Sequence, residues 1–142
     1  MQHHIVVTPL RKAVTSLALA LNRFSSPDTD SDDIEREMMR DAVIQRFEYT
    51  YELSWKMLRR VLRTTAPQSK TDGLLSMKDL YRLGYEAGLI TDPKAWFSYH
   101  EARNITSHVY DEKKAAIVIG AVIHFAPDAQ KLLETLENSY VA

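Results

Sequence analysis

The segment of this chain that is richest in reactive side chains reads Arg103-Asn104-Ile-Thr-Ser-His108-Val-Tyr110. An imidazole exchanges a proton near neutral pH and can serve as a general acid or base. A guanidinium stays charged and can hold phosphate oxygens in bidentate fashion. On a helix, one stripe would combine an aromatic ring, a carboxylate, an amide and an imidazole, from Phe97, Glu101, Asn104 and His108. Such a mixture differs from an ordinary solvated surface and indicates a functional or interface face.

Helical geometry limits what this segment can do by itself. Asn104 and His108 are four residues apart, so they would be neighbours, and the amide could orient the imidazole. Arg103 and His108 are five apart, which leaves them roughly 140° apart around a straight helix. The two side chains can therefore converge on one small group only in two ways. Either the helix loosens near His108, or a second copy of the segment completes the site in a dimer.

Apolar residues that recur every three or four positions predict the helices that carry this segment. Pro9 and Pro93 each suit the first position of a helix, where a missing N–H costs nothing. Asp32 is followed by Glu35 in capping-box spacing, and Gly88 stops a short helix. The predicted helices cover about residues 9–24, 32–64, 77–87, 92–110 and 111–140, with a loop over 25–33 and a polar linker over 64–76.

The two longest helices should supply most of the core. The second has an apolar face formed by Met38, Ile44, Phe47, Tyr51, Trp55, Leu58 and Leu62. The last is apolar nearly all round from Ala115 to Phe125, so we expect it to be covered on more than one side. Pro127 should kink or split this helix. Close approach of a neighbouring helix is favoured by the small residues Ala115, Ala116, Gly120 and Ala121.

These elements predict an all-α protein: an antiparallel four-helix up-and-down bundle with one additional short helix, in a single domain spanning residues 1–142. Only 4 Gly and 5 Pro are present, too few turn formers for a barrel or sandwich of many short strands. A second protomer would cover the free side of the last helix. We therefore expect a homodimer.

Composition narrows the class of protein further. The formal net charge of −1 argues against a non-specific nucleic-acid coat protein, although it does not exclude a local basic groove. Cysteine is absent, which excludes disulfides and thiolate metal sites and suits a reducing cytoplasm. The N-terminal residues show no signal-peptide pattern, and no apolar stretch reaches the length of a membrane span. We expect a cytoplasmic protein with no cofactor and no metal.

Two sequence blocks resemble one known family. Arg103 to Tyr110 resembles the R-x4-H-x-Y motif of the HEPN superfamily. The stretch Gln45-Arg-Phe-Glu-Tyr-Thr-Tyr-Glu-Leu-Ser-Trp-Lys56 is similar to the second helix of its nucleotidyltransferase substrate-binding protein branch. The residues from Asp92 through Ala115 also fit that branch. The similarity is close from about Asp41 to Ala116, and the order and spacing of both blocks make it specific.

The resemblance implies both an activity and a partner. Members of the family are helical bundles that dimerise with the Arg and the His near a shared cleft. Many are metal-independent ribonuclease toxins whose genes lie beside a minimal nucleotidyltransferase antitoxin. By this resemblance, Arg103 and His108 are catalytic residues. Asn104, which we count with them, is well placed to orient His108 or the substrate. Tyr110 matches the tyrosine to which the antitoxin can add AMP, which would place a bulky anion beside the site.

Two charged stripes on the second helix have more than one interpretation. Lys56, Arg59, Arg60 and Arg63 lie at i, i+3, i+4 and i+7, so they share one face. That face is either a solvated surface that complements the helix C-terminus or a contact for RNA phosphates. Glu48 and Glu52 lie one turn apart; without a histidine in the pattern, an ordinary charged face is favoured over a metal site.

A rival function belongs to a different class of protein. In a non-catalytic substrate-binding subunit of a two-component nucleotidyltransferase, Arg103 and His108 would bind a nucleotide or the partner rather than cut RNA. A plain helical interaction module is a third alternative. The sequence does not separate the ribonuclease from the substrate-binding subunit, because either role could keep the motif.

Overall fold

The computed structural model describes residues 5–26, 32–65 and 76–140, and all of its regular elements there are helical. They are α1 (Thr8–Ser25), α2 (Asp33–Thr65), α4 (Met77–Glu86), α5 (Pro93–Asn104), the 3₁₀ turn η1 (Thr106–His108) and α6 (Glu112–Tyr140). The all-α prediction is confirmed. The two predicted connections, over 25–33 and 64–76, lie largely outside the described residues.

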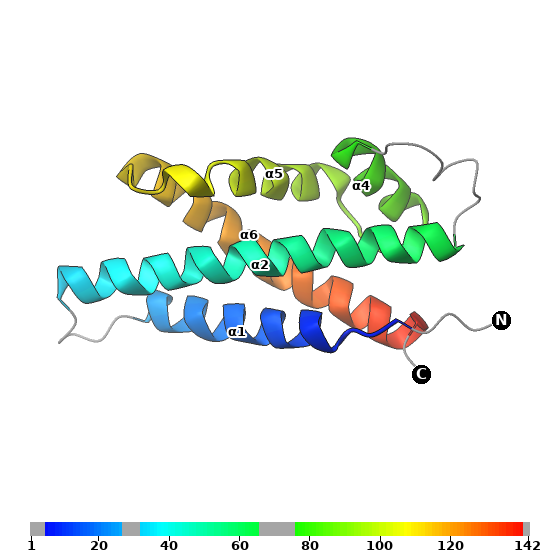
Figure 1. Ribbon diagram of the computed structural model, residues 1–142, viewed down its shortest axis with the longest axis horizontal. Coiled ribbons are helices and arrows are strands. Elements are labelled where there is room, and N and C mark those ends of the chain that lie inside the picture. Colours follow the sequence, from blue (N-terminus) through cyan, green and yellow to red (C-terminus); the bar gives the residue numbers. More distant parts are fainter. Residues whose placement is uncertain (1–4, 27–31, 66–75, 141–142) are drawn as a thin grey trace.

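The four long helices alternate in direction along the chain (Figure 1). Helices α1 and α2 lie side by side and antiparallel, and α5 runs back along the opposite side of α2. Helix α6 crosses behind α2 and contacts α1, α2, α5 and η1. The short α4 packs mainly against α5 and α2. This is an antiparallel bundle of four helices with one additional short helix, as expected from the sequence.

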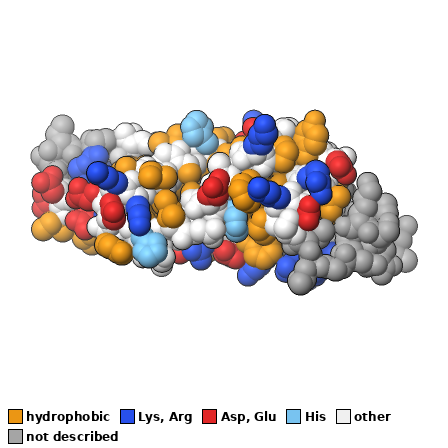
Figure 2. Space-filling view, turned by 90° about the horizontal axis from the view of Figure 1, so that it is seen from above, with side chains coloured by type: hydrophobic (Ala, Val, Ile, Leu, Met, Phe, Trp, Pro, Cys, Tyr) orange, Lys and Arg blue, Asp and Glu red, His pale blue; other side chains and the backbone are white. Residues whose placement is uncertain are grey.

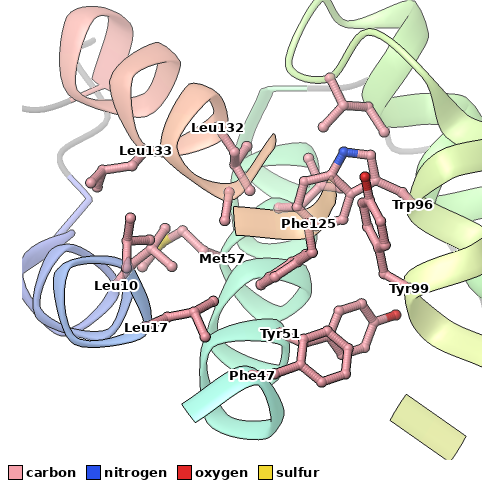
Figure 3. Packing of buried hydrophobic residues seen from close by; sticks show 14 of the residues in the cluster. Leu10, Leu17, Phe47, Tyr51, Met57, Trp96, Tyr99, Phe125, Leu132 and Leu133 are labelled. Carbon is pink, nitrogen blue, oxygen red and sulfur yellow. The ribbon is translucent and has the colours of Figure 1, made fainter. Parts of the chain in front are cut away.

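An aromatic cluster fixes α5 between α2 and α6 (Figure 3). Phe125 of α6 is fully buried at its centre and meets the ring of Phe47 at 5.2 Å, Tyr99 at 5.2 Å and Trp96 at 5.7 Å between centroids, all edge-on. Edge-to-face contacts at such distances stabilise beyond the area that they bury. Because Trp96 and Tyr99 belong to α5, this cluster sets where the C-terminal turn of α5 lies.

Neutral hydroxyl groups tie the helices together inside the core. The hydroxyls of Tyr51 on α2 and Tyr81 on α4 are hydrogen bonded, and the Tyr99 hydroxyl donates to Asp128 on α6. Burial raises the pKa of all three tyrosines well above the ordinary value, so they stay protonated. Thr50 Oγ1 donates to the carbonyl of Ala13 at 3.2 Å, linking α2 to α1.

The helix starts agree with the capping residues of the sequence. Asp32 accepts a hydrogen bond from the backbone N–H of Glu35 at 2.8 Å, and Asp92 accepts one from Ala95 at 3.1 Å. Gly88 has a φ of +76°, which explains why a glycine ends this turn after α4.

The prediction of one helix from 92 to 110 is wrong, since α5 ends at Asn104 and η1 follows. Ile105 leaves helical geometry, with φ −101° and ψ 3°. The hydroxyl of Thr106 donates to the carbonyl of Arg103 at 2.8 Å, so a side chain competes with the helical backbone for this acceptor. Two consecutive β-branched residues weaken the helix further. The loosening near His108 is therefore built into the local sequence.

Two predictions of burial on α2 need correction. Met38, near the start of α2, is 65% exposed rather than buried. Trp55, in the second half of α2, is only partly buried, because its indole lies against the charged side chains of Glu52 and Arg59. Helix α6 continues through Pro127 without splitting, since buried residues on both sides hold it against the core. The described residues of this chain cover α6 on one side, where Ala115 is in the core, and leave Ile117 61% exposed. That a second protomer covers the other side stays a prediction.

Residues 112–139 are long and apolar enough to cross a membrane by length and composition alone. A core helix of a bundle passes the same test. The buried positions of α6 fit that explanation, because they pack into the shared core at Ala115, Val118, Val122, Phe125, Ala129, Leu132, Leu133 and Leu136.

Candidate functional site

Arg103 lies in the last turn of α5 and reaches across to α2. Its Nη1 is 3.2 Å from Glu48 Oε2, and its Nε is 3.3 Å from Glu52 Oε1. Nη1 also donates to Thr106 Oγ1 at 2.8 Å. About a third of the side chain remains exposed, so the guanidinium is oriented by its neighbours without being sealed from a ligand.

The two carboxylates are themselves held in place. Glu52 accepts a hydrogen bond from the indole Nε1 of Trp55 at 3.2 Å and lies 3.8 Å from the ammonium of Lys56. Glu48, Glu52 and Arg103 line a hollow of about 590 Å³ beside Tyr49. The sequence favoured an ordinary charged face for this carboxylate pair, and its pairing with Arg103 was missed. The only available signal was that both glutamates fall in the block that resembles the family's second helix.

His108 ends η1 and is exposed, as is Tyr110, whose side chain is 82% accessible. The imidazole Nδ1 and the Tyr110 hydroxyl are 3.5 Å apart, and the two rings meet edge-on with centroids 6.0 Å apart. The backbone N–H of His108 donates to Ile105 O at 3.0 Å, as a tight turn requires. The imidazole and the phenol are therefore presented together to solvent.

Asn104 has a different neighbour from the one that an uninterrupted helix would supply. Its amide Nδ2 is 3.4 Å from Nε2 of His100, one turn earlier on α5. Because α5 ends at Asn104, His108 does not lie on the same helical face as Asn104, as an uninterrupted helix would place it. Arg103 thus contacts α2, Asn104 contacts α5, and His108 contacts Tyr110. The three side chains lie on one short stretch of chain but make separate sets of contacts.

The described histidines are His100 on α5, His108 on η1 and His124 on α6. Figure 2 shows the side that α4 and α5 cover, where histidine side chains lie among acidic, basic and hydrophobic ones. Charges of both signs are interspersed there. Within residues 5–26, 32–65 and 76–140, no three His, Asp or Glu side chains are grouped as a metal site would need.

Helix α6 presents an exposed apolar stripe that begins shortly after His108 in the sequence. Ile117 and Ile123 are 61% and 50% exposed, and Ala116, Gly120 and His124 are exposed beside them. These positions share one side of the helix because they recur at helical spacing. A Cβ added to Gly120 would meet no atom of the chain within 4 Å. Nothing inside the described part of this protomer therefore requires a glycine at this position.

The basic residues predicted as one stripe do lie together. Lys56, Arg59, Arg60 and Arg63 line a hollow of about 650 Å³ between the second half of α2 and the start of α1. Its apolar lining comes from Leu53 and Met57 of α2 and from Val6 and Pro9. The guanidinium of Arg59 lies 4.9 Å from the ring centroid of Trp55.

The sequence of the chain is similar to those of known proteins. A family model described as nucleotidyltransferase substrate binding protein like matches residues 7–138. A protein of Haemophilus influenzae named probable ribonuclease HepT is 38% identical over 110 residues, which are 75% of each chain.

Solved structures also resemble the whole bundle. One from Haemophilus influenzae, described as revealing the fold of a substrate-binding domain of a nucleotidyltransferase, has a TM-score of 0.85 and 34% identity over 93% of this chain and 99% of its own. A protein from Thermus thermophilus has a TM-score of 0.70 and 29% identity, covering 89% of this chain and 98% of its own.

Proposed function

Because the chain belongs to the nucleotidyltransferase substrate-binding-protein-like family, we propose that it is a cytoplasmic, toxin-like, metal-independent endoribonuclease of the HEPN type, paired with a minimal nucleotidyltransferase. The observation that carries this proposal is the intact Arg103–His108 pair at the end of α5, where the helix breaks and both side chains reach solvent. The name of the Haemophilus influenzae relative supports the same activity.

Each side chain has a defined role in the proposed reaction. The imidazole of His108 takes the proton of a ribose 2′-hydroxyl, whose oxygen then attacks the adjacent phosphorus. The bond from phosphorus to the 5′-oxygen breaks and the protonated His108 returns its proton to that oxygen, which leaves a 2′,3′-cyclic phosphate and a 5′-hydroxyl. Arg103 stabilises the charge on the phosphate oxygens. Asn104 supports the reaction by orienting the substrate, since its amide contacts His100 rather than His108.

The proposed roles of Arg103 and His108 need no metal ion, so we expect cleavage in the presence of a chelator. The purified protein should cut RNA at a rate that EDTA leaves unchanged, with cyclic phosphate ends detected by mass spectrometry. Loss of activity on chelation would contradict the metal-independent mechanism. Failure to cut any RNA, together with normal growth of cells that express the protein without its partner, would reject the ribonuclease function.

We also propose that the protein acts as a homodimer through the exposed stripe on α6. This stripe is apolar, its small residues permit close approach of a second helix, and the helix that carries it packs against η1. A two-fold axis there would bring two copies of His108 and Arg103 toward one cleft. The dimer would thus bring together in one site side chains that make separate contacts within a single protomer.

Replacing Gly120 with glutamate should convert the dimer into a folded monomer. The Cβ has room within the protomer, so folding is retained, but a carboxylate buried at a helix contact would be strongly unfavourable. Light scattering at micromolar concentration measures the mass. The matched control Asn22→Glu adds the same charge on the exposed face of α1 and should remain dimeric. A wild-type protein that is a clean monomer would contradict the shared cleft.

Tyr110 is the residue that we propose the partner modifies. Its hydroxyl is exposed and 3.5 Å from the His108 imidazole, so an attached AMP would place a phosphate beside the site and compete for Arg103. With ATP and the nucleotidyltransferase, the intact mass should rise by one adenylyl group and RNA cleavage should fall. Tyr110→Phe should show no mass change; a modified Tyr110→Phe protein would place the acceptor elsewhere.

The alternative function is that of a non-catalytic nucleotide-binding subunit of a two-component nucleotidyltransferase. The description of the Haemophilus influenzae structure as a substrate-binding domain supports it. In this case Arg103 and His108 would hold a nucleotide phosphate, and the protein would bind ATP or another nucleotide without cutting RNA. Calorimetric titration with nucleotides, run beside the cleavage assay, separates the two functions.

A further inference from the structure

The basic hollow at the C-terminal half of α2 is lined by positively charged side chains and by no acidic one among the described residues. Arg59, Arg60 and Arg63 have no acidic partner within 4.0 Å among the residues that the structure describes, and Lys56 shares Glu52 with Arg103. The protein as a whole carries a net charge of −1. A local excess of cations in such a chain favours an anionic ligand.

This hollow adjoins the hollow beside Arg103. Leu53 lines both hollows, and the carboxylate of Glu52 bridges them, with one oxygen 3.3 Å from Arg103 Nε and the other 3.8 Å from Lys56 Nζ. A row of positive side chains therefore starts at Arg103 and continues along one face of α2 to Arg63. In the described part of the chain, no acidic side chain other than Glu48 and Glu52 lines either hollow.

The spacing of the row suits a single polynucleotide strand. Cations three or four residues apart on a helix are separated by about 4.5–6 Å along its axis, comparable to successive phosphates on an extended strand. The apolar side chains of Leu53, Met57 and Val6 give bases a surface to lie against. The Arg59 guanidinium carbon lies 4.9 Å from the Trp55 ring centroid, a cation–π contact that holds the side chain in the hollow, where its N–H groups can donate to a phosphate.

We propose that Lys56, Arg59, Arg60 and Arg63 form a track for single-stranded RNA, which leads the strand to the scissile phosphate at Arg103. This inference rests on the proposed ribonuclease function for the identity of the ligand. It adds the form of the substrate and its path, because one row of cations on one helix matches one strand. An acidic face of a protein partner is the competing occupant, and the test separates the two.

The test measures RNA binding in a protein that does not cut its ligand. In the full chain carrying His108→Ala, the affinity for a fluorescein-labelled oligouridylate is measured by anisotropy at several salt concentrations. Each phosphate contact on a single strand contributes about −0.7 to the slope of log affinity against log salt, so Arg59→Ser, Arg60→Ser and Arg63→Ser together should reduce the slope by about 2. Duplex RNA should compete poorly for the site.

Two controls separate the loss of the track from a general loss of positive charge and from a change in folding. Replacing Arg23, Lys94 and Lys131 with serine removes the same charge from exposed positions on α1, α5 and α6, and should leave the slope unchanged. The double variant Arg60→Ser, Arg63→Ser keeps the contact of Arg59 with Trp55, and should lower the slope by about 1.4. An unchanged slope in these variants, or an equal loss in the control, overturns the track.

The remaining outcomes distinguish the track from the proposed function. If the triple variant binds RNA normally but no longer binds the nucleotidyltransferase, the groove is a protein-docking surface and the inference is wrong. If the slope falls as expected while the wild-type protein cuts no RNA, the track stands and the ribonuclease function fails. Preferential binding of duplex over single-stranded RNA would also overturn the inference.

Discussion

Replacing His108 with alanine should lower the rate of RNA cleavage by about 10²–10⁴-fold, the contribution typical of a general acid or base. His108 is exposed at the end of η1, and its ring contacts Tyr110 rather than the core. The loss should therefore arise from missing proton transfer and leave the thermal melt of the helices unchanged. Single-turnover cleavage of a labelled RNA measures the rate directly.

The matched control for this variant is Ser107→Ala, which alters an exposed side chain in the same turn. It should cleave RNA at the wild-type rate. In cells that lack the nucleotidyltransferase, growth should be slowed by the wild type and restored by His108→Ala. A variant that retains full cleavage would remove His108 from the mechanism. If the wild-type protein cuts no RNA and His108→Ala loses nucleotide binding, the substrate-binding function is favoured instead.

The second large effect concerns stability. Replacing Phe125 with alanine should lower the free energy of unfolding by about 3–5 kcal/mol, as for other buried phenylalanines. Phe125 is 0% exposed and packs against aromatic rings from both α2 and α5, so its loss opens a cavity where three helices meet. Since whole domains are stable by only about 5–15 kcal/mol, this is a large share of the total. Urea denaturation followed by circular dichroism measures it.

The control for Phe125 is Leu19→Ala on α1, because Leu19 is 66% exposed. Removing an exposed side chain should change the stability by no more than about 0.5 kcal/mol. Equal losses in the two variants would mean that the aromatic cluster does not hold α5. At temperatures where Phe125→Ala is still folded, its rate of RNA cleavage should also be lower than that of the wild type. The reason is that Trp96 and Tyr99 would no longer fix α5, which carries Arg103 at its end.

Helix positions were predictable because they depend on local chemistry. Asp32, Ser76 and Asp92 cap their helices through hydrogen bonds to residues three positions later, and these spacings are visible in the chain. The end of α5 was missed for a reason that is also local. The competition of the Thr106 hydroxyl for a backbone carbonyl is weaker than a proline or glycine signal, and apolar periodicity continued past it.

The burial of α6 shows where a pattern ceases to decide. Residues 115–125 are apolar on nearly every side, so periodicity did not tell which side faces the core. Contacts with α1, α2 and α5 select the side of Val118, Val122 and Phe125, and leave Ile117 and Gly120 open. The homodimer stays a prediction, and the open stripe is the surface on which it depends.

The sequence alone determined the helical class, the order of the helices and which residue types could do chemistry, because these follow from periodicity, caps and the motif. Only the tertiary structure decided the acidic partners of Arg103. Glu48 and Glu52 are distant from it along the chain, and their pairing depends on how α5 packs against α2. That packing is set by the aromatic cluster around Phe125, whose members come from three helices. Local spacing carries no information about such contacts between elements.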